Sequence, residues 1–235
     1  MRIASYNIRS GGKGGAFSQW QSIMSHASPD ILLVQESYDP KKYIDPIFYE
    51  QNQNQFIWQP KPSNEQRIQW GSAIYVRTGK IKPIQPPEKY QGYVIGAEVE
   101  GFVWGQEELN LRILNFHAPT PYKASFNEIL DWLVSSFDFE DGYLWVIGGD
   151  FNDAISLAVN LLRIELGMIP CWQNMNEYSF EILPTLRQRG KLYYCDGIFV
   201  PAVWYQWMYY PEMLILSDWE SLSDHDPVIA SFLDE

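Results

Sequence analysis

The sequence is poor in cysteine, in basic residues and in long apolar runs. Among its 235 residues, Cys171 and Cys195 are the only cysteines and form no CxxC pair, so a disulfide scaffold is disfavoured. No stretch approaches the ~18 uninterrupted apolar residues of a membrane-spanning helix, and the N-terminus has no apolar run typical of a signal peptide. We therefore expect reduced thiols and a cytoplasmic, monomeric protein without a membrane span.

Basic residues are outnumbered by acidic ones. The chain has 17 Lys and Arg against 29 Asp and Glu, which gives a formal net charge of -12. Tight nonspecific binding to nucleic acid through a basic surface is disfavoured, because such binding depends on neutralising phosphates with Lys and Arg. Phosphate chemistry is not excluded, because a carboxylate cluster can hold a divalent cation that then meets an anionic substrate.

Apolar residues make up 46% of the chain and aromatic residues 16%, which is enough to bury a substantial core. The length fits one large domain, and the sequence shows no internal repeat of fixed period, no linker and no block of like charge. We therefore predict that residues 1–235 form a single catalytic domain.

Local patterns predict strands alternating with helices. Residues 30–36 are apolar enough to form a strand that is covered on both faces. The predicted helices are residues 17–27, 124–137 and 154–166, and the other predicted strands are residues 2–8, 70–77, 92–99, 111–117, 143–147, 192–200, 213–216 and 228–232. The three strands between residues 70 and 117 are expected to be antiparallel neighbours, because turn residues connect them. Residues 41–62 give no clear assignment.

Four predicted strands end on a polar residue. These residues are Asn7 in RIASYN, Glu36 in ILLVQE, His117 in LRILNFH and Asp150 in LWVIGGD. An ionised carboxylate beside a core is destabilising unless it is paired or bound to a metal ion. We therefore expect these groups to be one another's partners.

Asp196 lies within the apolar run LYYCDGIFV and needs a compensating partner. The best candidate is His225 in SDHDPV, because an Asp–His pair fixes the ring tautomer and favours the protonated ring. The alternative is that Asp196 is an ordinary turn residue before Gly197, since Asp-Gly is a favourable turn dipeptide.

These polar residues occur in the order of known motifs. Asn7 lies in YNI, Glu36 in VQE, Asp150 and Asn152 in GDFN, and Asp224 and His225 in SDHDPV, with Asp196 before an apolar strand. In this order they resemble the motifs of the endonuclease/exonuclease/phosphatase superfamily, which includes deoxyribonuclease I, exonuclease III and inositol polyphosphate phosphatases. The resemblance implies an α/β fold, a four-layer sandwich of two mixed β-sheets packed face to face with helices on the outside.

Chemistry and resemblance together imply a metal-dependent reaction. Phosphodiesters resist attack because negative charge surrounds the phosphorus, so the site must supply cationic stabilisation and a deprotonated nucleophile. Glu36 is the first expected ligand of Mg²⁺ or Mn²⁺, with Asn7 and Asp224 assisting, because hard cations prefer carboxylate and amide oxygens.

The same resemblance implies roles for five further residues. Asp150 would orient and deprotonate the attacking water, and Asn152 would donate to a phosphate oxygen. His225, held by Asp196, would place a cationic ring against the developing charge. His117 matches the position where a His or Tyr contacts the phosphate or assists the leaving group, and its alternative is a core histidine satisfied by the backbone.

A basic stretch precedes Asp196 in LRQRGKLYYCD. Its Arg187, Arg189 and Lys191 are expected to contact the substrate, with Arg9 as a further candidate. The alternative for the stretch is a solvated surface turn. Together with the metal ion, this loop would hold the substrate.

Departures from subfamily patterns bear on the substrate. Inositol polyphosphate phosphatases resemble one another in a basic residue after the Asp that corresponds to Asp196, where this chain has Gly197. Apurinic-site enzymes show Arg-Ile-Asp-Tyr where residues 194–197 are YCDG. We favour a nuclease that hydrolyses DNA or RNA phosphodiesters, with a phosphatase or phosphodiesterase of small or lipid phosphoesters as the alternative. An inactive binding module is the third hypothesis, disfavoured because no expected catalytic residue is missing.

Overall fold

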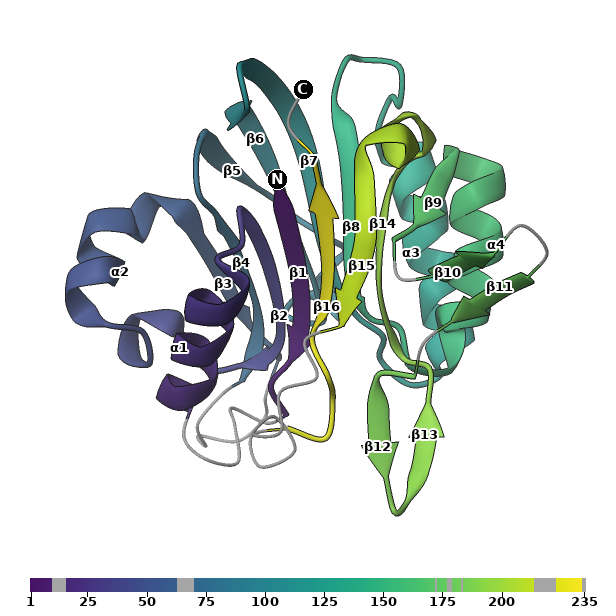
Figure 1. The fold of residues 1–235 in the computed structure, drawn as a ribbon, viewed down its shortest axis with the longest axis horizontal. Coiled ribbons are helices and arrows are strands. Elements are labelled where there is room, and N and C mark those ends of the chain that lie inside the picture. Colours follow the sequence, from purple (N-terminus) through teal and green to yellow (C-terminus); the bar gives the residue numbers. More distant parts are fainter. Residues whose placement is uncertain are drawn as a thin grey trace.

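The computed structural model describes residues 1–9, 16–62, 70–171, 173–176, 179–182, 184–213 and 223–233. Two six-stranded mixed sheets pack face to face, with helices on their outer sides (Figure 1). In spatial order, the first sheet contains β15 (Met208–Met213), β16 (Val228–Phe232), β1 (Arg2–Asn7), β2 (Ile31–Ser37), β4 (Gly71–Val76) and β3 (Phe56–Pro60). The second contains β5 (Lys80–Ile84), β6 (Val94–Trp104), β7 (Glu107–His117), β8 (Leu144–Asp150), β14 (Asp196–Pro201) and β9 (Met168–Pro170). This arrangement confirms the predicted four-layer α/β sandwich.

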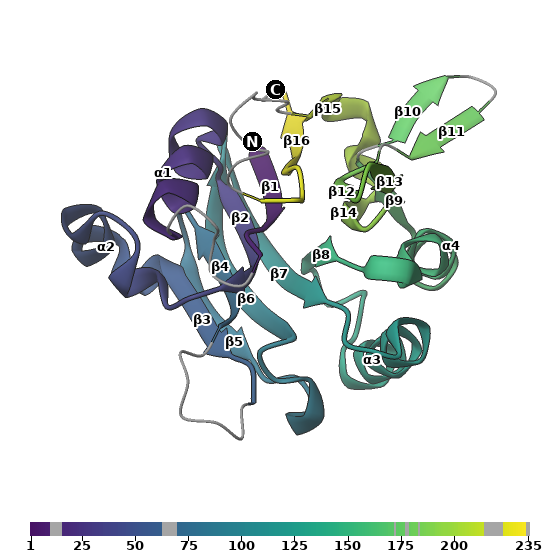
Figure 2. The same cartoon turned by 90° about the horizontal axis from the view of Figure 1, so that it is seen from below.

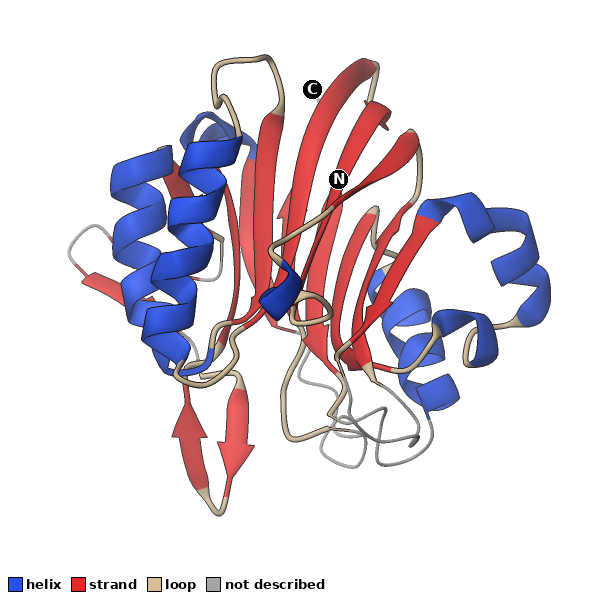
Figure 3. Ribbon diagram, turned by 180° about the vertical axis from the view of Figure 1, so that it is seen from behind, coloured by secondary structure: helices blue, strands red, loops and turns tan. Residues whose placement is uncertain are grey.

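The outer layers are helical (Figure 2). α1 (Ala16–Ala27) and α2 (Pro46–Asn52) lie beside the first sheet, and α3 (Tyr122–Ser136) and α4 (Ile155–Leu166) lie beside the second, as Figure 3 shows from behind. The described 3-10 turns are η1 (Pro40–Lys42), η2 (Gln53–Gln55), η3 (Glu88–Tyr90), η4 (Asn152–Ala154) and η5 (Ala202–Trp207). Two separate hairpins are β10 (Gln173–Asn176) with β11 (Ser179–Ile182), and β12 (Leu186–Gln188) with β13 (Lys191–Tyr193).

Strand β2 contributes to two cores at once. Successive side chains of a strand point to opposite faces of its sheet. Leu33 is buried in the core between the two sheets, whereas Leu32 and Val34 belong to a second core that includes Trp20 of α1. The prediction that this strand is covered on both faces is confirmed, and the apolar area buried on each face stabilises the layered arrangement.

One predicted pairing is wrong. β6 and β7 pair antiparallel as expected, but β4 lies in the first sheet between β2 and β3. After β4 the chain passes from the first sheet to the second, where β5 is the next strand, and η3 then leads to β6. Turn residues indicate a change of direction, and they do not determine which sheet the next strand joins.

Three other segments differ from the prediction. The strand predicted at residues 192–200 is divided into β13 and β14, because the backbone N–H groups of Cys195 and Asp196 donate to the Thr185 side chain. The unassigned residues 41–62 form α2 and β3 with short 3-10 turns. The strand predicted at 213–216 corresponds to β15, which begins at Met208, and residues 214–216 lie outside the described residues.

Strand register brings the polar strand ends to one end of the sandwich. In the second sheet, β7 and β8 run parallel with His117 opposite Asp150, and the antiparallel β14 places Asp196 on the other side of Asp150. In the first sheet, the parallel strands β1 and β2 carry Asn7 and Glu36 at their carboxyl ends. Both sheets therefore contribute to one group of polar side chains.

The two cysteines lie within the packed structure. Cys171 and Cys195 are buried free thiols, and burial raises the pKa of both. They therefore stay protonated and pack as small apolar groups. Among the described helices, none is long and apolar enough to cross a membrane.

Candidate active site

Asp150 is a buried carboxylate at the end of β8, with 2% of its surface exposed. Its Oδ2 accepts a hydrogen bond from Asn7 Nδ2 at 2.8 Å, and its Oδ1 accepts one from the backbone N–H of Asn152 at 2.9 Å. Burial raises the pKa of Asp150 to about 7, helped by the nearby Asp196 and opposed by His225 and the two hydrogen bonds. The carboxyl group is therefore poised to gain or lose a proton near neutral pH.

The two glycines before Asp150 lie in close contact with a neighbouring strand and with the facing sheet. Gly149 has φ of 140°, and a Cβ atom there would lie 1.9 Å from the backbone oxygen of Phe116 on β7. A Cβ on Gly148 would lie 2.6 Å from Leu33 Cδ1 in the facing sheet. The GGD sequence therefore lets β8 approach both its neighbour and the opposite sheet, which brings Asp150 to the first sheet's residues.

Asp196 and His225 form a close pair, as the sequence predicted. His225 Nδ1 lies 2.7 Å from Asp196 Oδ2, and the Thr185 hydroxyl donates to the same oxygen at 2.7 Å. Burial disfavours the charged ring, but the attraction and hydrogen bond of Asp196, with Asp150 and Asp224 adding to them, raise the pKa of His225 to about 10. The ring is therefore an imidazolium at neutral pH, with Nε2 4.0 Å from Asp150 Oδ2.

Glu36 and His117 complete the group from opposite sheets. Glu36 has a left-handed φ of 54°, an uncommon conformation for a residue with a Cβ atom. His117 Nε2 lies 3.7 Å from Glu36 Oε1 and 3.9 Å from Asp150 Oδ2. Burial, together with the positive charges of Lys61 and His225, lowers the pKa of His117 well below its usual value. At neutral pH, His117 is therefore uncharged, whereas His225 carries a positive charge.

The side-chain donors fit a divalent cation. Among the described residues, ligand atoms of Asp150, Asp196 and His225 lie within 4.8 Å of one another, a spacing that can hold a metal ion. The protonated His225 ring has no lone pair to offer, so carboxylates are the better ligands. Glu36 adds a further carboxylate beside Asp150. Such oxygen-rich donors suit a hard cation of the Mg²⁺ or Mn²⁺ type.

The amide of Asn7 has a defined orientation. Its Oδ1 accepts the backbone N–H of Arg9 at 2.8 Å, which identifies that atom as the oxygen. Its Nδ2 donates to Asp150 and lies 3.4 Å from Glu36 Oε1. The NH₂ group therefore faces the carboxylates, and Asn7 would have to turn its amide over to bind a metal ion through oxygen.

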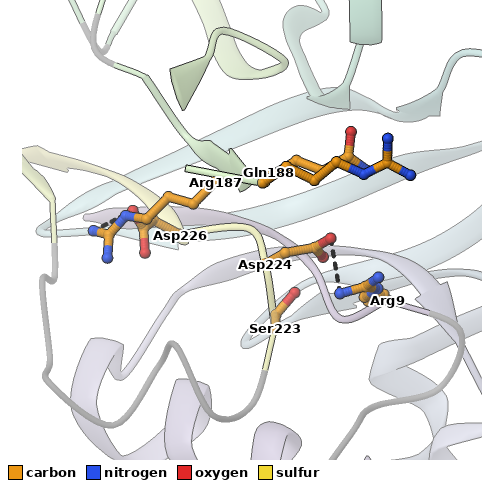
Figure 4. Close-up of a pocket in the computed structure, with 7 residues that line it drawn as sticks. Arg9, Arg187, Gln188, Ser223, Asp224 and Asp226 are labelled. Atoms are coloured by element: carbon orange, nitrogen blue, oxygen red, sulfur yellow. Dashed lines mark hydrogen bonds and ion pairs between the residues drawn. The ribbon is translucent and has the colours of Figure 1, made fainter. Parts of the chain in front are cut away.

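A second group of expected residues surrounds a cavity of about 490 Å³ next to this centre (Figure 4). Asp224, expected to bind the metal, has Oδ2 2.9 Å from the guanidinium of Arg9. Arg187 lies 2.9 Å from Asp226, and Arg189 also lines the cavity. Lys191 is exposed on β13 and is not among the lining residues. The structure thus groups three of the four expected substrate residues and leaves Lys191 on the hairpin.

The sequence patterns do not single out several residues that lie near the centre. The Trp70 ring is stacked with His117, and Lys61 Nζ lies over the Trp70 ring. The Thr185 hydroxyl donates to Asp196, and the Ser223 hydroxyl donates to the backbone oxygen of Asn7 at 2.8 Å. Ser223 precedes Asp224 in the SDHDPV motif, so its position was a usable signal. Lys61 lies in the stretch without a clear assignment, and only its buried surroundings single it out.

Comparison with known proteins identifies the fold. No protein-family model and no curated protein matches the chain. Comparison with solved structures shows that the chain has the deoxyribonuclease I-like fold of the endonuclease/exonuclease/phosphatase superfamily, which confirms the resemblance indicated by its motifs.

Three solved structures illustrate the likeness. An AP endonuclease from Archaeoglobus fulgidus has 17% identity and a TM-score of 0.70, with 99% of each chain covered. A 3'-5' exonuclease from Neisseria meningitidis has 20% identity and a TM-score of 0.66, again with 99% of each chain covered. An endonuclease/exonuclease/phosphatase from Beutenbergia cavernae has 13% identity and a TM-score of 0.66 over 98% of this chain and 70% of that one.

Proposed function

We propose that this protein is a divalent-metal-dependent phosphoesterase, and that its preferred substrates are DNA or RNA phosphodiesters. The proposal rests on the contact between a carboxylate that can accept a proton and a protonated imidazole ring. Asp150 is a buried carboxylate whose pKa is raised to about 7, and the imidazolium of His225 lies 4.0 Å from it. A general base with a pKa near the working pH, next to a fixed positive charge, suits attack of water on an anionic ester.

The reaction follows from these positions. Asp150 accepts a proton from a water molecule, the water oxygen forms a bond to phosphorus, and the bond from phosphorus to the leaving oxygen breaks. Asn152 donates to a phosphate oxygen, and His225 stabilises the negative charge that develops there. Glu36, with Asn7 and Asp224 as further expected ligands, would hold a Mg²⁺ or Mn²⁺ ion, and the ion would supply positive charge to the phosphate.

His117 has a different proposed role from His225. Its ring is neutral because burial lowers its pKa, so it can donate a hydrogen bond without adding charge. We assign it to a contact with the phosphate or the leaving oxygen. Its Nε2 lies within 4 Å of both Glu36 and Asp150, which supports that placement.

The nuclease assignment draws on the cavity and on the structural relatives. Arg9, Arg187 and Arg189 line the cavity next to the centre, where they can contact phosphates of a polynucleotide. The similar structures from Archaeoglobus fulgidus and Neisseria meningitidis are an AP endonuclease and a 3'-5' exonuclease. Because the centre draws on residues from Asn7 to His225, we propose that residues 1–235 act as one catalytic domain.

A small phosphoester is the second candidate substrate, and the charge of the chain favours it. The net charge of -12 repels a long polyanion that extends over the protein surface, whereas a small ester contacts only the residues of the candidate active site. Arg9 and Arg187 already pair with Asp224 and Asp226, which reduces the cationic surface available to a nucleic acid backbone. The same catalytic residues serve either substrate.

Parallel assays with two substrate classes test the proposal. Plasmid nicking and oligonucleotide cleavage, run with Mg²⁺, Mn²⁺ or EDTA, are compared with phosphate release from a panel of nucleotides and inositol phosphates. We expect metal-dependent cleavage of nucleic acid that EDTA abolishes. Release from the small-molecule panel alone supports the second candidate. Absence of metal-dependent hydrolysis in both assays contradicts the proposed function.

A further inference from the structure

Lys61 is a buried lysine that follows β3, with only 9% of its surface exposed. Its Nζ lies 3.7 Å from the centroid of the Trp70 ring and 3.9 Å from that of Tyr93. Within the described part of the chain, Nζ makes no hydrogen bond and no ion pair. Cation–π contacts attract the ammonium group but leave its three N–H donors without acceptors. A buried, unpaired charge is destabilising, which suggests that a ligand compensates the charge of this lysine.

The ammonium group belongs to the candidate active site by its surroundings. The Trp70 ring is stacked with His117 at a centroid distance of 5.9 Å, and the Tyr93 ring lies 6.2 Å from His117. Burial lowers the pKa of Lys61 to about 7, while the negative charges of Glu36 and Asp150 oppose that change. The ammonium group therefore lies within the field of the same two carboxylates, without being paired to either.

The backbone of Lys61 is held in place by its neighbours. Its N–H donates to the carbonyl of Trp70 at 3.0 Å. Gly92, with φ of 75°, packs so closely that a Cβ atom there would lie 2.4 Å from Lys61 N and 2.2 Å from Pro60 O. The Ser72 hydroxyl donates to the Gly92 carbonyl at 3.0 Å and holds this turn in place. The fold thus places the lysine beside the centre, independently of any contact its side chain makes.

We propose that Lys61, whose Nζ lies over the Trp70 and Tyr93 rings, binds a phosphate oxygen of the substrate at a position separate from the cavity of Arg9 and Arg187. An anionic oxygen would accept the unused N–H donors and compensate the buried charge, which the rings alone cannot do. In its protonated form, the amine would act as a point charge that orients the phosphate. This inference rests on the proposed function, because it assumes that the ligand at this centre is a phosphoester.

Substitution of Lys61 by an apolar residue tests the inference. Lys61→Met removes the charge and keeps the unbranched chain, and Lys42→Met on η1 is the matched control because Lys42 is exposed. Inorganic phosphate is the probe, titrated by calorimetry into each protein with Mg²⁺ present. We expect Lys61→Met to bind phosphate at least tenfold more weakly, and Lys42→Met to bind within twofold of the unaltered protein. Lys61→Gln, which keeps donors without charge, should be intermediate and replaces Lys61→Met if that variant does not fold.

Thermal unfolding separates a ligand-binding lysine from a structural one. Removing an unpaired buried charge should leave the melting temperature of Lys61→Met unchanged or higher. A lower melting temperature combined with unchanged phosphate affinity overturns the inference, as does a failure of the unaltered protein to bind phosphate. Competition by a nucleoside monophosphate and by a single-stranded oligonucleotide then distinguishes a small ester from a polynucleotide as the source of the phosphate.

Kinetic assays separate this inference from the proposed function. If the unaltered protein hydrolyses phosphoesters and Lys61→Met has the same KM and phosphate inhibition, the inference fails and the proposed function stands. If no phosphoester is hydrolysed but phosphate binding depends on Lys61, the inference stands and the proposed function fails.

Discussion

At the scale of single residues, Asp150 combines deep burial with contacts to donors and to charged groups of both signs. Asn7 and the Asn152 backbone N–H stabilise its ionised form, whereas burial and Asp196 oppose ionisation. The opposing effects balance near neutral pH. A carboxylate in this state can take a proton from water during a reaction and release it again.

Asp150→Asn should abolish most activity without destabilising the protein. We expect a fall in rate of about 10²–10⁴, the usual contribution of a positioned base. Because its pKa rises from 3.8 to about 7 on folding, Asp150 stabilises the fold at low pH and loses that contribution as pH rises through 7. The neutral variant should therefore be at least as stable as the unaltered protein at pH 8 in EDTA.

Initial rates and thermal unfolding at pH 8 check this prediction. Asp153→Asn is the matched control, since Asp153 is an exposed neighbour on η4 and should retain activity. Activity of Asp150→Asn within tenfold of the unaltered protein would refute the assignment of Asp150 as the base.

His225 should make the stability of the protein depend on pH in the alkaline range. Its pKa is raised from 6.5 to about 10 in the folded protein, so its contribution is fully present below 6.5 and is lost as pH rises through 10. The stability difference between the unaltered protein and His225→Gln should therefore shrink between these pH values. Urea unfolding across that range measures the difference, and a flat profile would contradict the imidazolium assignment.

At the scale of elements, β12 and the preceding residue, Thr185, support the Asp–His pair. Asp226 N–H donates to the Thr185 carbonyl at 2.7 Å, and Arg187 N–H donates to the Asp224 carbonyl at 2.8 Å. The loop that carries His225 is thereby paired to the stem of the β12–β13 hairpin. The Thr185 hydroxyl also accepts the backbone N–H groups of Cys195 and Asp196, so Thr185 connects three segments through its hydroxyl and its carbonyl together.

Thr185→Val should destabilise the protein and weaken activity. The substitution removes the donor to Asp196 Oδ2 and leaves two buried N–H groups without their acceptor, at a cost of about 1–3 kcal/mol. Thr185→Ser retains the hydroxyl and serves as the control. Urea unfolding and initial rates should show a deficit in the valine variant that is largely absent from the serine variant. Equal behaviour of the two variants would mean that the hydroxyl has no such role.

The close approach of β8 to β7 predicts that Gly149 cannot be replaced without a loss of stability. Gly149→Ala would place a methyl group 1.9 Å from the Phe116 carbonyl oxygen, so the strands must separate. We expect a loss of roughly 4 kcal/mol or more in the free energy of unfolding. Gly167→Ala is the control, because Gly167 also has a positive φ but has open space around it, and should cost only about 1–2 kcal/mol. Similar losses in urea unfolding would contradict this explanation of the GGD sequence.

At the scale of the whole molecule, a buried polar contact joins the two sheets behind the site. Asn115 on β7 donates to the carbonyls of Val34 and Ala73 in the facing sheet at 2.9 and 2.8 Å. Gln35 donates to Asn115 Oδ1 at 2.7 Å. Because Gln35 precedes Glu36 in the chain, this contact ties the position of Glu36 to the second sheet. Buried hydrogen bonds of this kind favour one arrangement of the sheets over others.

The acidic charge of the whole molecule should make nucleic acid binding depend on metal ions. With a net charge of -12, the protein repels a polyanion unless a divalent cation bridges the two. We expect an Asp150→Asn variant to retain an oligonucleotide in a filter-binding assay with Mg²⁺ and to lose it in EDTA. Tight binding in EDTA would show that a basic surface, rather than the cation, holds the substrate.

Much of the fold was predictable from local pattern. The apolar run ending at Glu36 forms a strand covered on both faces, and residues 124–137 form a helix within two residues of the predicted bounds. The polar residues at strand ends predicted the site, because a polar residue at the end of a buried strand is stable only if other polar groups pair with it. The Asp196–His225 contact followed from the same reasoning, since a carboxylate in an apolar run requires compensation.

The sequence by itself determined which segments become strands and helices, and which polar side chains must find partners, because periodicity and the cost of burying charge act locally. The tertiary structure decided that β4 joins the first sheet, that the NH₂ group of Asn7 faces the carboxylates, and that Lys61 lies against two aromatic rings beside the centre. These features depend on contacts between residues far apart in the chain. Neither spacing nor composition encodes such contacts, because they arise only when the two sheets pack together.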